Sequence, residues 1–244
     1  MNKDQGDHEM SIVTIAGQYG SMSDSIADHL ARRLGWRLSN HDITTRVADK
    51  IGISEEEAVM HDEHAYGFFD RFLFHMAYNY PAVYAHDQLE NPQIAIEQEK
   101  LCHEVQQLVI GEVAREGRVV IVGRGSQVLL ADQQRVLHVR IVAPFAQRVQ
   151  ATMQEACIDE ARACRLVRRM DQRQRYFYRS RYKYDVNDPV LYDLVLNTSV
   201  CDLDRQVDLI CLALEHKALP SPALVSTPAH LAAQLTTISV LSTH

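Results

Sequence analysis

The chain has 244 residues, of which 46% are hydrophobic and 23% are charged, and its formal net charge is -7 at pH 7. This composition is ordinary for a soluble globular protein, and no apolar run approaches the roughly 20 residues that a membrane-spanning helix needs, so we expect no membrane-embedded segment. The polar start MNKDQGDHEM lacks the apolar core of a secretory signal, so we expect a cytoplasmic protein. The acidic balance disfavours general nucleic-acid binding.

The first predicted element is a buried parallel strand at residues 11–17, SIVTIAG. A helix follows, with apolar residues at helical spacing and Gly35 at its end. Ser21 or Ser23 is predicted to cap its start. The pattern is typical of the first strand and helix of an α/β protein.

The turn between this strand and this helix resembles a phosphate-binding loop. Gly17, Gly20 and Ser25 keep the spacing G-x-x-G-x-x-x-x-S. In such loops, backbone N–H groups hold an anion at the helix N-terminus, a lysine reaches the outer phosphates, and a serine or threonine helps to hold magnesium. Met22 and Ser23 occupy the positions of the expected glycine and lysine. A tight turn without a ligand is the alternative interpretation.

The next segments are predicted as a short strand with its loop, WRLSNHD, and a helix that ends at Gly52. Residues 54–116 are predicted to be mainly helical and to include a long amphipathic helix. Within them, HDEH at 61–64 places two histidines on adjacent turns but has no clear third ligand. We therefore interpret it as a polar helix start rather than a metal site.

Two further buried strands are predicted at 118–125 and 135–144. The first ends in GRG, with Arg124 between two glycines. Ligands of open α/β sheets bind at the carboxyl ends of the strands, so Arg124 is a candidate for contacting an anion. The alternative is a surface arginine in an ordinary turn.

An arginine-rich helix is predicted at 159–181. Arg168, Asp171 and Arg175 are spaced i, i+3 and i+7 and therefore share one helix face, with Arg173 beside them. Guanidinium groups match phosphate oxygens, which favours multidentate phosphate recognition. A solvated charged face is one alternative, and stacking of single-stranded RNA on the interleaved tyrosines is another.

A fifth strand at 192–199 and a closing helix at 203–217 complete the pattern, and the composition changes to Pro, Ser, Thr and Ala from about Pro220. Strands that alternate with helices predict a mainly parallel sheet covered on both faces. The five cysteines are scattered and are expected to be buried free thiols.

Taken in this order, TIAGQYGS, VVIVGRGS, HVRIVAPFAQRV, the helix around Asp171 and DPVLYDLVLNTSVCDLDRQVDLI resemble the cytidylate kinase-like family, relatives of the P-loop nucleoside monophosphate (NMP) kinases. The resemblance covers most of residues 11–217. It implies a three-layer α/β P-loop kinase fold with a five-stranded parallel sheet, a helical NMP-binding insertion at 54–116 and an arginine-rich lid at 159–188. Residues 218–244 would be a linker and a C-terminal tail.

The resemblance also implies an activity: transfer of the γ-phosphoryl of ATP, with Mg²⁺, to a nucleoside monophosphate, CMP being one candidate. The nucleotide-binding residues would be Gly17, Gly20, Ser21, Met22, Ser23, Asp24 and Ser25, with Ser25 also at the magnesium. Asp42 and Arg124 would contact the acceptor, and the catalytic residues would be Arg168, Asp171, Arg173 and Arg175.

Two other functions remain open at this point. One is a catalytically silent regulator that binds nucleotides, and the other is an RNA-binding protein that uses the Arg/Tyr-rich helix. The implied partners are small nucleotides. Family members with GRD use its aspartate to read cytosine, whereas this chain has Gly125 there, so the base specificity does not carry over. The sequence does not indicate an oligomeric state.

Overall fold

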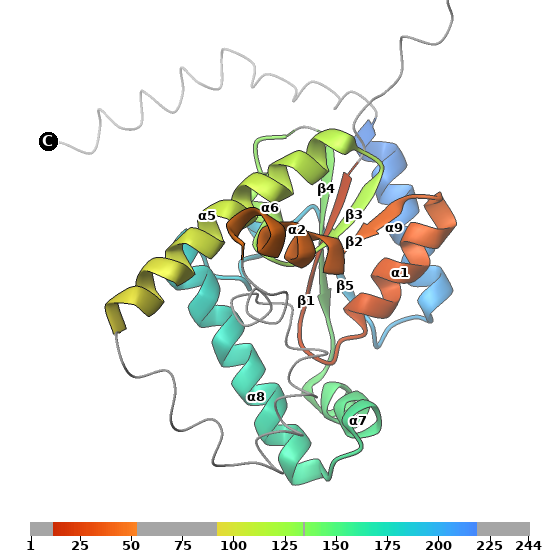
Figure 1. Cartoon of the computed structure of the whole chain (residues 1–244). Coiled ribbons are helices and arrows are strands. Elements are labelled where there is room, and N and C mark those ends of the chain that lie inside the picture. The colour runs from red at the N-terminus through yellow and green to blue at the C-terminus, as the bar shows by residue number, and fades with distance from the viewer. Residues whose placement is uncertain (1–11, 53–91, 134, 219–244) are drawn as a thin grey trace, which may run out of the picture.

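The computed structural model describes residues 12–52, 92–133 and 135–218, which form a parallel sheet with helices on both of its faces (Figure 1). The strands are β1 (Ile12–Gly17), β2 (Arg37–Ser39), β3 (Val119–Val122), β4 (Val136–Val142) and β5 (Leu194–Asn197). Their order is β2-β3-β1-β4-β5, and every neighbouring pair is parallel. In the register of the central strand, Ile12 lies opposite both Val119 and Val136.

Alternate residues of β1 pack into two separate cores, because successive side chains of a strand point to opposite faces. Val13 and Ile15 pack against α1 (Ser23–Leu34) and α9 (Leu203–Ala218). Ile12 packs against α2 (His41–Ile51) and α5 (Pro92–Glu116). The chain therefore has a three-layer α/β fold around a five-stranded parallel sheet, as the sequence predicts.

The remaining helices lie mostly at the carboxyl ends of the strands. They are α6 (Ser126–Leu129), α7 (Phe145–Ala156), α8 (Glu160–Phe177), the π-helix η1 (Tyr178–Tyr182) and the 3-10 helix η2 (Pro189–Leu191). Figure 1 shows α7 and α8 below the sheet, next to the loop that joins β1 to α1. This loop, α7 and α8 thus meet at one edge of the molecule.

The predicted elements agree with the structure except in a few details. The long amphipathic helix is α5, and the predicted arginine-rich helix continues past α8 as the π-helical turn η1. The rest of the predicted insertion, including HDEH, lies outside the described residues, as does the C-terminal tail. The prediction of buried thiols is wrong: Cys157 is exposed at the end of α7, and Cys164, Cys201 and Cys211 are half-buried, although all four are free as expected.

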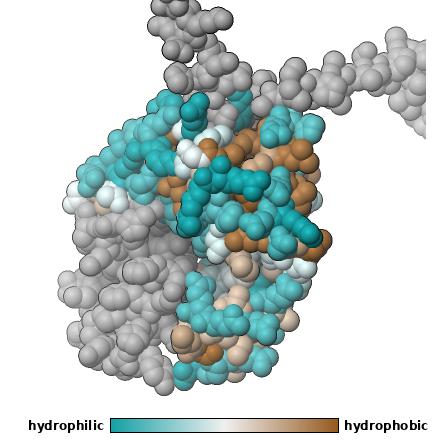
Figure 2. All heavy atoms as spheres, turned by 90° about the vertical axis from the view of Figure 1, so that its right-hand side faces the viewer, coloured by the Kyte–Doolittle hydropathy of each residue, from teal (hydrophilic) through white to brown (hydrophobic). Residues whose placement is uncertain are grey.

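The face formed by α1 and α9 is mainly hydrophilic, with separate apolar patches (Figure 2). Two polar contacts join these helices: an ion pair of Arg33 with Asp208 at 2.5 Å, and a contact of Nε2 of His29 with a carboxylate oxygen of Asp204 at 3.0 Å. Both pairs are solvent-exposed, so each adds little to stability. Within the described part of the chain, none of the helices is long and apolar enough to cross a bilayer.

A buried polar pair lies between the two central strands. Nδ1 of His138 on β4 is 2.7 Å from Oγ1 of Thr14 on β1, and His138 is only 7% exposed. Burial lowers the pKa of His138 to about 4, while Asp193 opposes this shift and Lys217 adds to it. The imidazole is therefore neutral in the folded protein at neutral pH.

We expect acid to destabilise the fold through this histidine. Below the ordinary pKa of 6.5, the unfolded chain takes up a proton that the folded chain refuses until about pH 4. The contribution of His138 to the free energy of unfolding is therefore fully present above pH 6.5. It is lost as the pH falls from 6.5 towards 4, at about 1.4 kcal/mol per pH unit. Urea unfolding of wild type and His138→Gln between pH 7 and pH 5 measures this loss, which the variant should lack. Equal slopes in both proteins would contradict the assignment.

Candidate functional site

The two glycines of the β1–α1 loop are required by close packing. A side chain on Gly17 would overlap the side chain of Ser23. Gly20 has a φ of 74°, and a Cβ there would lie 2.7 Å from the carbonyl oxygen of Arg148. Gly17 is therefore required by packing alone, whereas Gly20 is required both by packing and by its left-handed backbone conformation.

The start of α1 has no side-chain cap. Met22 is the N-cap residue in the left-handed conformation, with a φ of 65°, and it makes no capping hydrogen bond. The prediction that Ser21 or Ser23 caps the helix is thus wrong: Ser23 is buried against Gly17, and Oγ of Ser21 is buried without a hydrogen-bond partner. Uncapped N–H groups beside an unpaired hydroxyl fit an oxyanion at this helix N-terminus. Asp24 and Ser25 lie exposed in the same first turn.

We expect Met22→Gly to raise the free energy of unfolding by about 0.5 to 1 kcal/mol. A non-glycine residue in the left-handed region is strained, and Met22 is 53% exposed, so little burial is lost. Ser25→Gly is the matched control, because it introduces glycine at a helical position and should lower stability by a similar amount. Chemical denaturation measures both, and a less stable Met22→Gly protein would contradict the prediction.

Arg148 on α7 joins the loop to α8, a role that the sequence analysis did not assign. Its guanidinium is buried and forms a bidentate pair with Asp171, with N–O distances of 2.8 and 3.0 Å. It also donates to the carbonyl oxygens of Tyr19 in the loop and Ala143 before α7, each at 3.2 Å. A single side chain thus fixes the loop, the end of β4 and the middle of α8.

Gln174 makes a second connection between α8 and the loop. Its Nε2 donates to the carbonyl oxygen of Gly17 at 2.9 Å, and its Oε1 accepts from Nη2 of Arg140 on β4 at 3.2 Å. Because Asp171 and Gln174 are three residues apart, both connections leave the same region of α8. The middle of this helix is therefore held directly against the loop.

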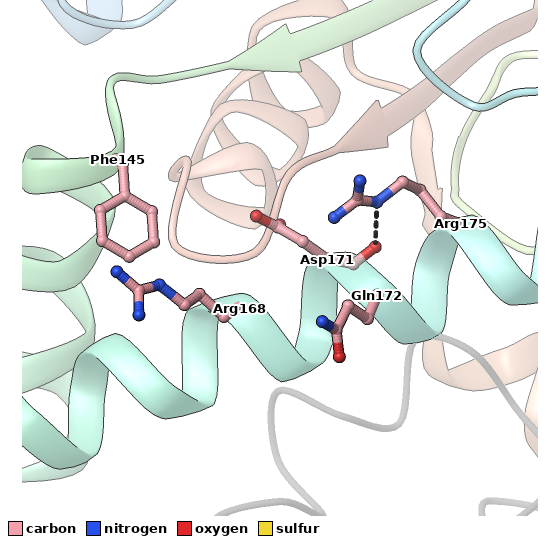
Figure 3. A pocket seen from close by; sticks show the side chains of 5 residues that line it. All are labelled: Phe145, Arg168, Asp171, Gln172 and Arg175. Atoms are coloured by element: carbon pink, nitrogen blue, oxygen red, sulfur yellow. Dashed lines mark hydrogen bonds between the residues drawn. The ribbon is translucent and has the colours of Figure 1, made fainter.

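A pocket of roughly 350 Å³ opens beside these connections (Figure 3). It is lined by Phe145, Arg168, Asp171, Gln172 and Arg175. The guanidinium of Arg168 lies 5.3 Å from the centre of the Phe145 ring, and Nε of Arg175 donates to the backbone carbonyl of Asp171 at 3.2 Å. Both arginines are exposed, so their charge is available to a ligand.

The structure confirms that Arg168, Asp171 and Arg175 share one face of α8, as their spacing predicts. Arg173 is not among the residues that line this pocket, because it is two residues from Asp171 and so about 200° around the helix. Of the four residues predicted to be catalytic, three are thus brought together. Asp171 is engaged by Arg148, which makes it an anchor for α8.

Arg124, predicted as an acceptor contact, lies at the carboxyl end of β3. The side chain does not project into solvent, because Arg124 is only 2% exposed. Its guanidinium donates to Oγ1 of Thr44 at 3.0 Å, to the carbonyl oxygen of Val122 at 3.2 Å and to Oδ1 of Asn40 at 3.3 Å. The alternative of an ordinary surface arginine does not hold either. The side chain connects the end of β3 to the start of α2.

Asp42, the other predicted acceptor contact, lies near Arg124 in the first turn of α2. Its Oδ1 accepts from Oγ of Ser39 at 2.5 Å, and its Oδ2 is buried without a hydrogen-bond partner. Among the residues that the structure describes, no cluster of three or more His, Cys, Asp or Glu side chains could hold a metal.

Comparison with known proteins is consistent with this arrangement. Residues 12–200 match the model of the Cytidylate kinase-like family. A Cytidylate kinase from Pyrococcus horikoshii is 34% identical over 109 residues, which make up 43% of this chain and 54% of that protein. The match thus spans about half the length of this curated relative.

Among solved structures, an uncharacterized protein from Eubacterium ventriosum superimposes with a TM-score of 0.60 at 16% identity. The superposition covers 84% of this chain and 98% of that one. This chain therefore shares its fold with nearly the whole of that protein.

Proposed function

Because this chain belongs to the cytidylate kinase-like family, we propose that it is a nucleotide kinase-type phosphotransferase that moves the γ-phosphoryl of ATP to a nucleoside monophosphate. The observation that carries the proposal is the direct connection between the glycine loop and the arginine-lined pocket, made by Arg148 and Gln174. Phosphoryl transfer depends mainly on positioning and on positive charge around the transferred group. The site has both.

In this proposal the loop amides from Gly20 to Ser25 bind the ATP phosphates at the start of α1. Magnesium, when bound at Ser25, neutralises phosphate charge and helps to orient the leaving group. Arg168 and Arg175 reach from the exposed side of α8 towards the transferred phosphoryl, and Asp171 holds that helix in place through Arg148. Arg173 would act from another face of the helix.

On the acceptor side, Arg124 and Asp42 are proposed to form the contacts with the monophosphate. The acceptor base stays open, with CMP as the first candidate. A side chain on Gly125 would overlap the ring of Tyr182, whose hydroxyl donates to the carbonyl oxygen of Arg124 at 3.1 Å. An aspartate therefore cannot replace Gly125 unless Tyr182 moves, so this chain must recognise its acceptor base differently.

A catalytically silent nucleotide-binding regulator is the second candidate. It is favoured by Ser23, which replaces the expected lysine and turns its side chain inward against Gly17. Such a protein would bind nucleotide at the loop without supplying enough charge for transfer. An RNA-binding role is the third candidate, which would use the exposed arginines of α8 and Tyr176.

An ADP-release assay across nucleoside monophosphates, with a no-acceptor control, tests the proposal. We expect ADP to form with one preferred acceptor. Gly20→Ala should abolish it, because a Cβ there meets the carbonyl oxygen of Arg148. Gly52→Ala is the matched control: Gly52 has a similar φ of 71°, but a Cβ there meets nothing within 4 Å. Nucleotide binding without turnover would support the regulator, and salt-sensitive RNA binding without nucleotide binding would support the third candidate.

A further inference from the structure

Arg140 is a buried arginine at the carboxyl end of β4. It is only 3% exposed and lies opposite Ala16 of β1 in the sheet register, one position before Gly17 begins the loop. Its Nη2 donates to Oε1 of Gln174 at 3.2 Å and to Oδ1 of Asn187 at 3.4 Å. The guanidinium thus lies beneath the contact between α8 and the loop.

The charge of Arg140 has no carboxylate partner within the described residues. Its contacts are two neutral amide oxygens and the ring of Tyr192, whose centre is 5.8 Å from the guanidinium carbon. Arg148 offers an internal comparison, because it is equally buried but carries the bidentate pair with Asp171. A buried charge without a counter-charge is costly, and folded proteins normally pair it.

The second terminal nitrogen of Arg140 has no hydrogen-bond partner among the residues that the structure describes. Nη1 is buried and unpaired, although a guanidinium nitrogen is a strong donor. Gln174, which accepts from Nη2 of Arg140, also donates to the carbonyl oxygen of Gly17, so the guanidinium is one side chain away from the start of the glycine loop. Within the described part of the chain, the Arg140 guanidinium thus lacks both a negatively charged partner and a hydrogen-bond acceptor for Nη1.

We propose that Arg140 binds an oxyanion of the substrate, specifically the phosphate group of the acceptor, through Nη1. The phosphate supplies both the counter-charge and the hydrogen-bond acceptor that the protein leaves out, and charge-assisted hydrogen bonds of this kind are strong. This inference rests on the proposed function and deepens it, because it adds an acceptor contact from the α8 side of the loop. Arg124 lies on the other side, at the end of β3.

Calorimetric titration of Arg140→Met with AMP, CMP, GMP and UMP tests this contact. We expect the best monophosphate to bind roughly 10- to 100-fold more weakly than to wild type, as loss of a charge-assisted hydrogen bond implies. The corresponding nucleoside, which lacks the phosphate, should bind both proteins equally. A non-hydrolysable ATP analogue should also bind both equally, which distinguishes the acceptor phosphate from the donor phosphates. Arg205→Met, which removes an exposed arginine of α9, is the matched control and should change none of these affinities.

A melting curve without ligand separates this role from a purely structural one. Removal of an uncompensated buried charge should leave the melting temperature of Arg140→Met equal to or above that of wild type. A lower melting temperature with unchanged monophosphate affinity would show that Arg140 only supports the fold. Wild-type protein that binds none of the four monophosphates would also overturn the inference. If Arg140→Met formed ADP at the wild-type rate, the proposed contact would be refuted and the proposed kinase activity would stand. If monophosphate binding depended on Arg140 but no ADP formed, the contact would stand and the kinase activity would be refuted.

Discussion

Replacing Arg175 with alanine is expected to lower kcat by about 100- to 1000-fold while it changes ATP affinity little. Arg175 lines the pocket beside the loop, is exposed, and is held by the carbonyl oxygen of Asp171 rather than by a carboxylate. Positive charge is needed where negative charge develops in the transition state, and Ser23 cannot supply it from within the loop. In our proposal, the arginines of α8 therefore take over the function of the missing lysine.

Four variants make this comparison decisive when each is measured with the best acceptor. Arg175→Lys should rescue poorly, because an ammonium keeps the charge but loses the planar fork that holds two phosphate oxygens. Arg169→Ala, an exposed arginine that is not among the pocket-lining residues, should behave as wild type. Ser23→Lys should gain little, because position 23 packs against Gly17. A wild-type rate in Arg175→Ala would show that the α8 arginine does not take over the function of the missing lysine. An inactive wild type that Ser23→Lys revives would identify the chain as a silenced relative.

Replacing Arg148 with methionine is expected to lower the free energy of unfolding by about 3 kcal/mol. The change leaves Asp171 without its partner, and breaking a buried ion pair on one side is strongly destabilising. The expected loss lies at the lower end of the range for broken buried ion pairs, because the side chain of Asp171 is 22% exposed. Since Arg148 also holds the carbonyl oxygen of Tyr19, the loop should lose its position and the activity should fall as well.

Urea denaturation measures this loss of unfolding free energy, and two further variants show whether it comes from the broken ion pair. Arg148→Met combined with Asp171→Leu removes both charges and should recover much of the stability. Arg32→Met removes one partner of an exposed i,i+4 pair with Asp28 on α1 and should cost less than about 0.5 kcal/mol. If Arg148→Met were as mild as Arg32→Met, the connection between loop and α8 would not be the structural element described above.

The features that local pattern specifies were predictable from the sequence. The order of strands and helices follows from hydrophobic periodicity, and the shared face of Arg168, Asp171 and Arg175 follows from helix geometry. The glycines of the loop are local signals too, since Gly20 permits a left-handed backbone that other residues resist and Gly17 leaves room for the side chain of Ser23. These features depend on residues close together in the chain.

The features that depend on distant contacts were not predictable. Arg148 meets Asp171 across 23 residues, and Gln174 meets the carbonyl oxygen of Gly17 across 157. Arg148 lies within the quoted segment HVRIVAPFAQRV and Gln174 within the arginine-rich helix, but nothing local in the sequence marks either residue as a contact of the loop. The same reason applies to Arg124, because its burial depends on Thr44, 80 residues away. A single sequence records which side chains are present but not which of them meet once the sheet has formed.

The two connections between α8 and the loop have a thermodynamic consequence. Because Arg148 and Gln174 each hold a loop carbonyl and α8 together, a shift of the helix displaces the loop, and ordering of the loop restrains the helix. Occupation of the donor site would therefore reduce the entropy that the acceptor must still overcome when it orders α8. Linkage makes this effect reciprocal: each nucleotide would tighten the binding of the other by the same factor. The factor would shrink when one connection is cut and disappear only when both are cut.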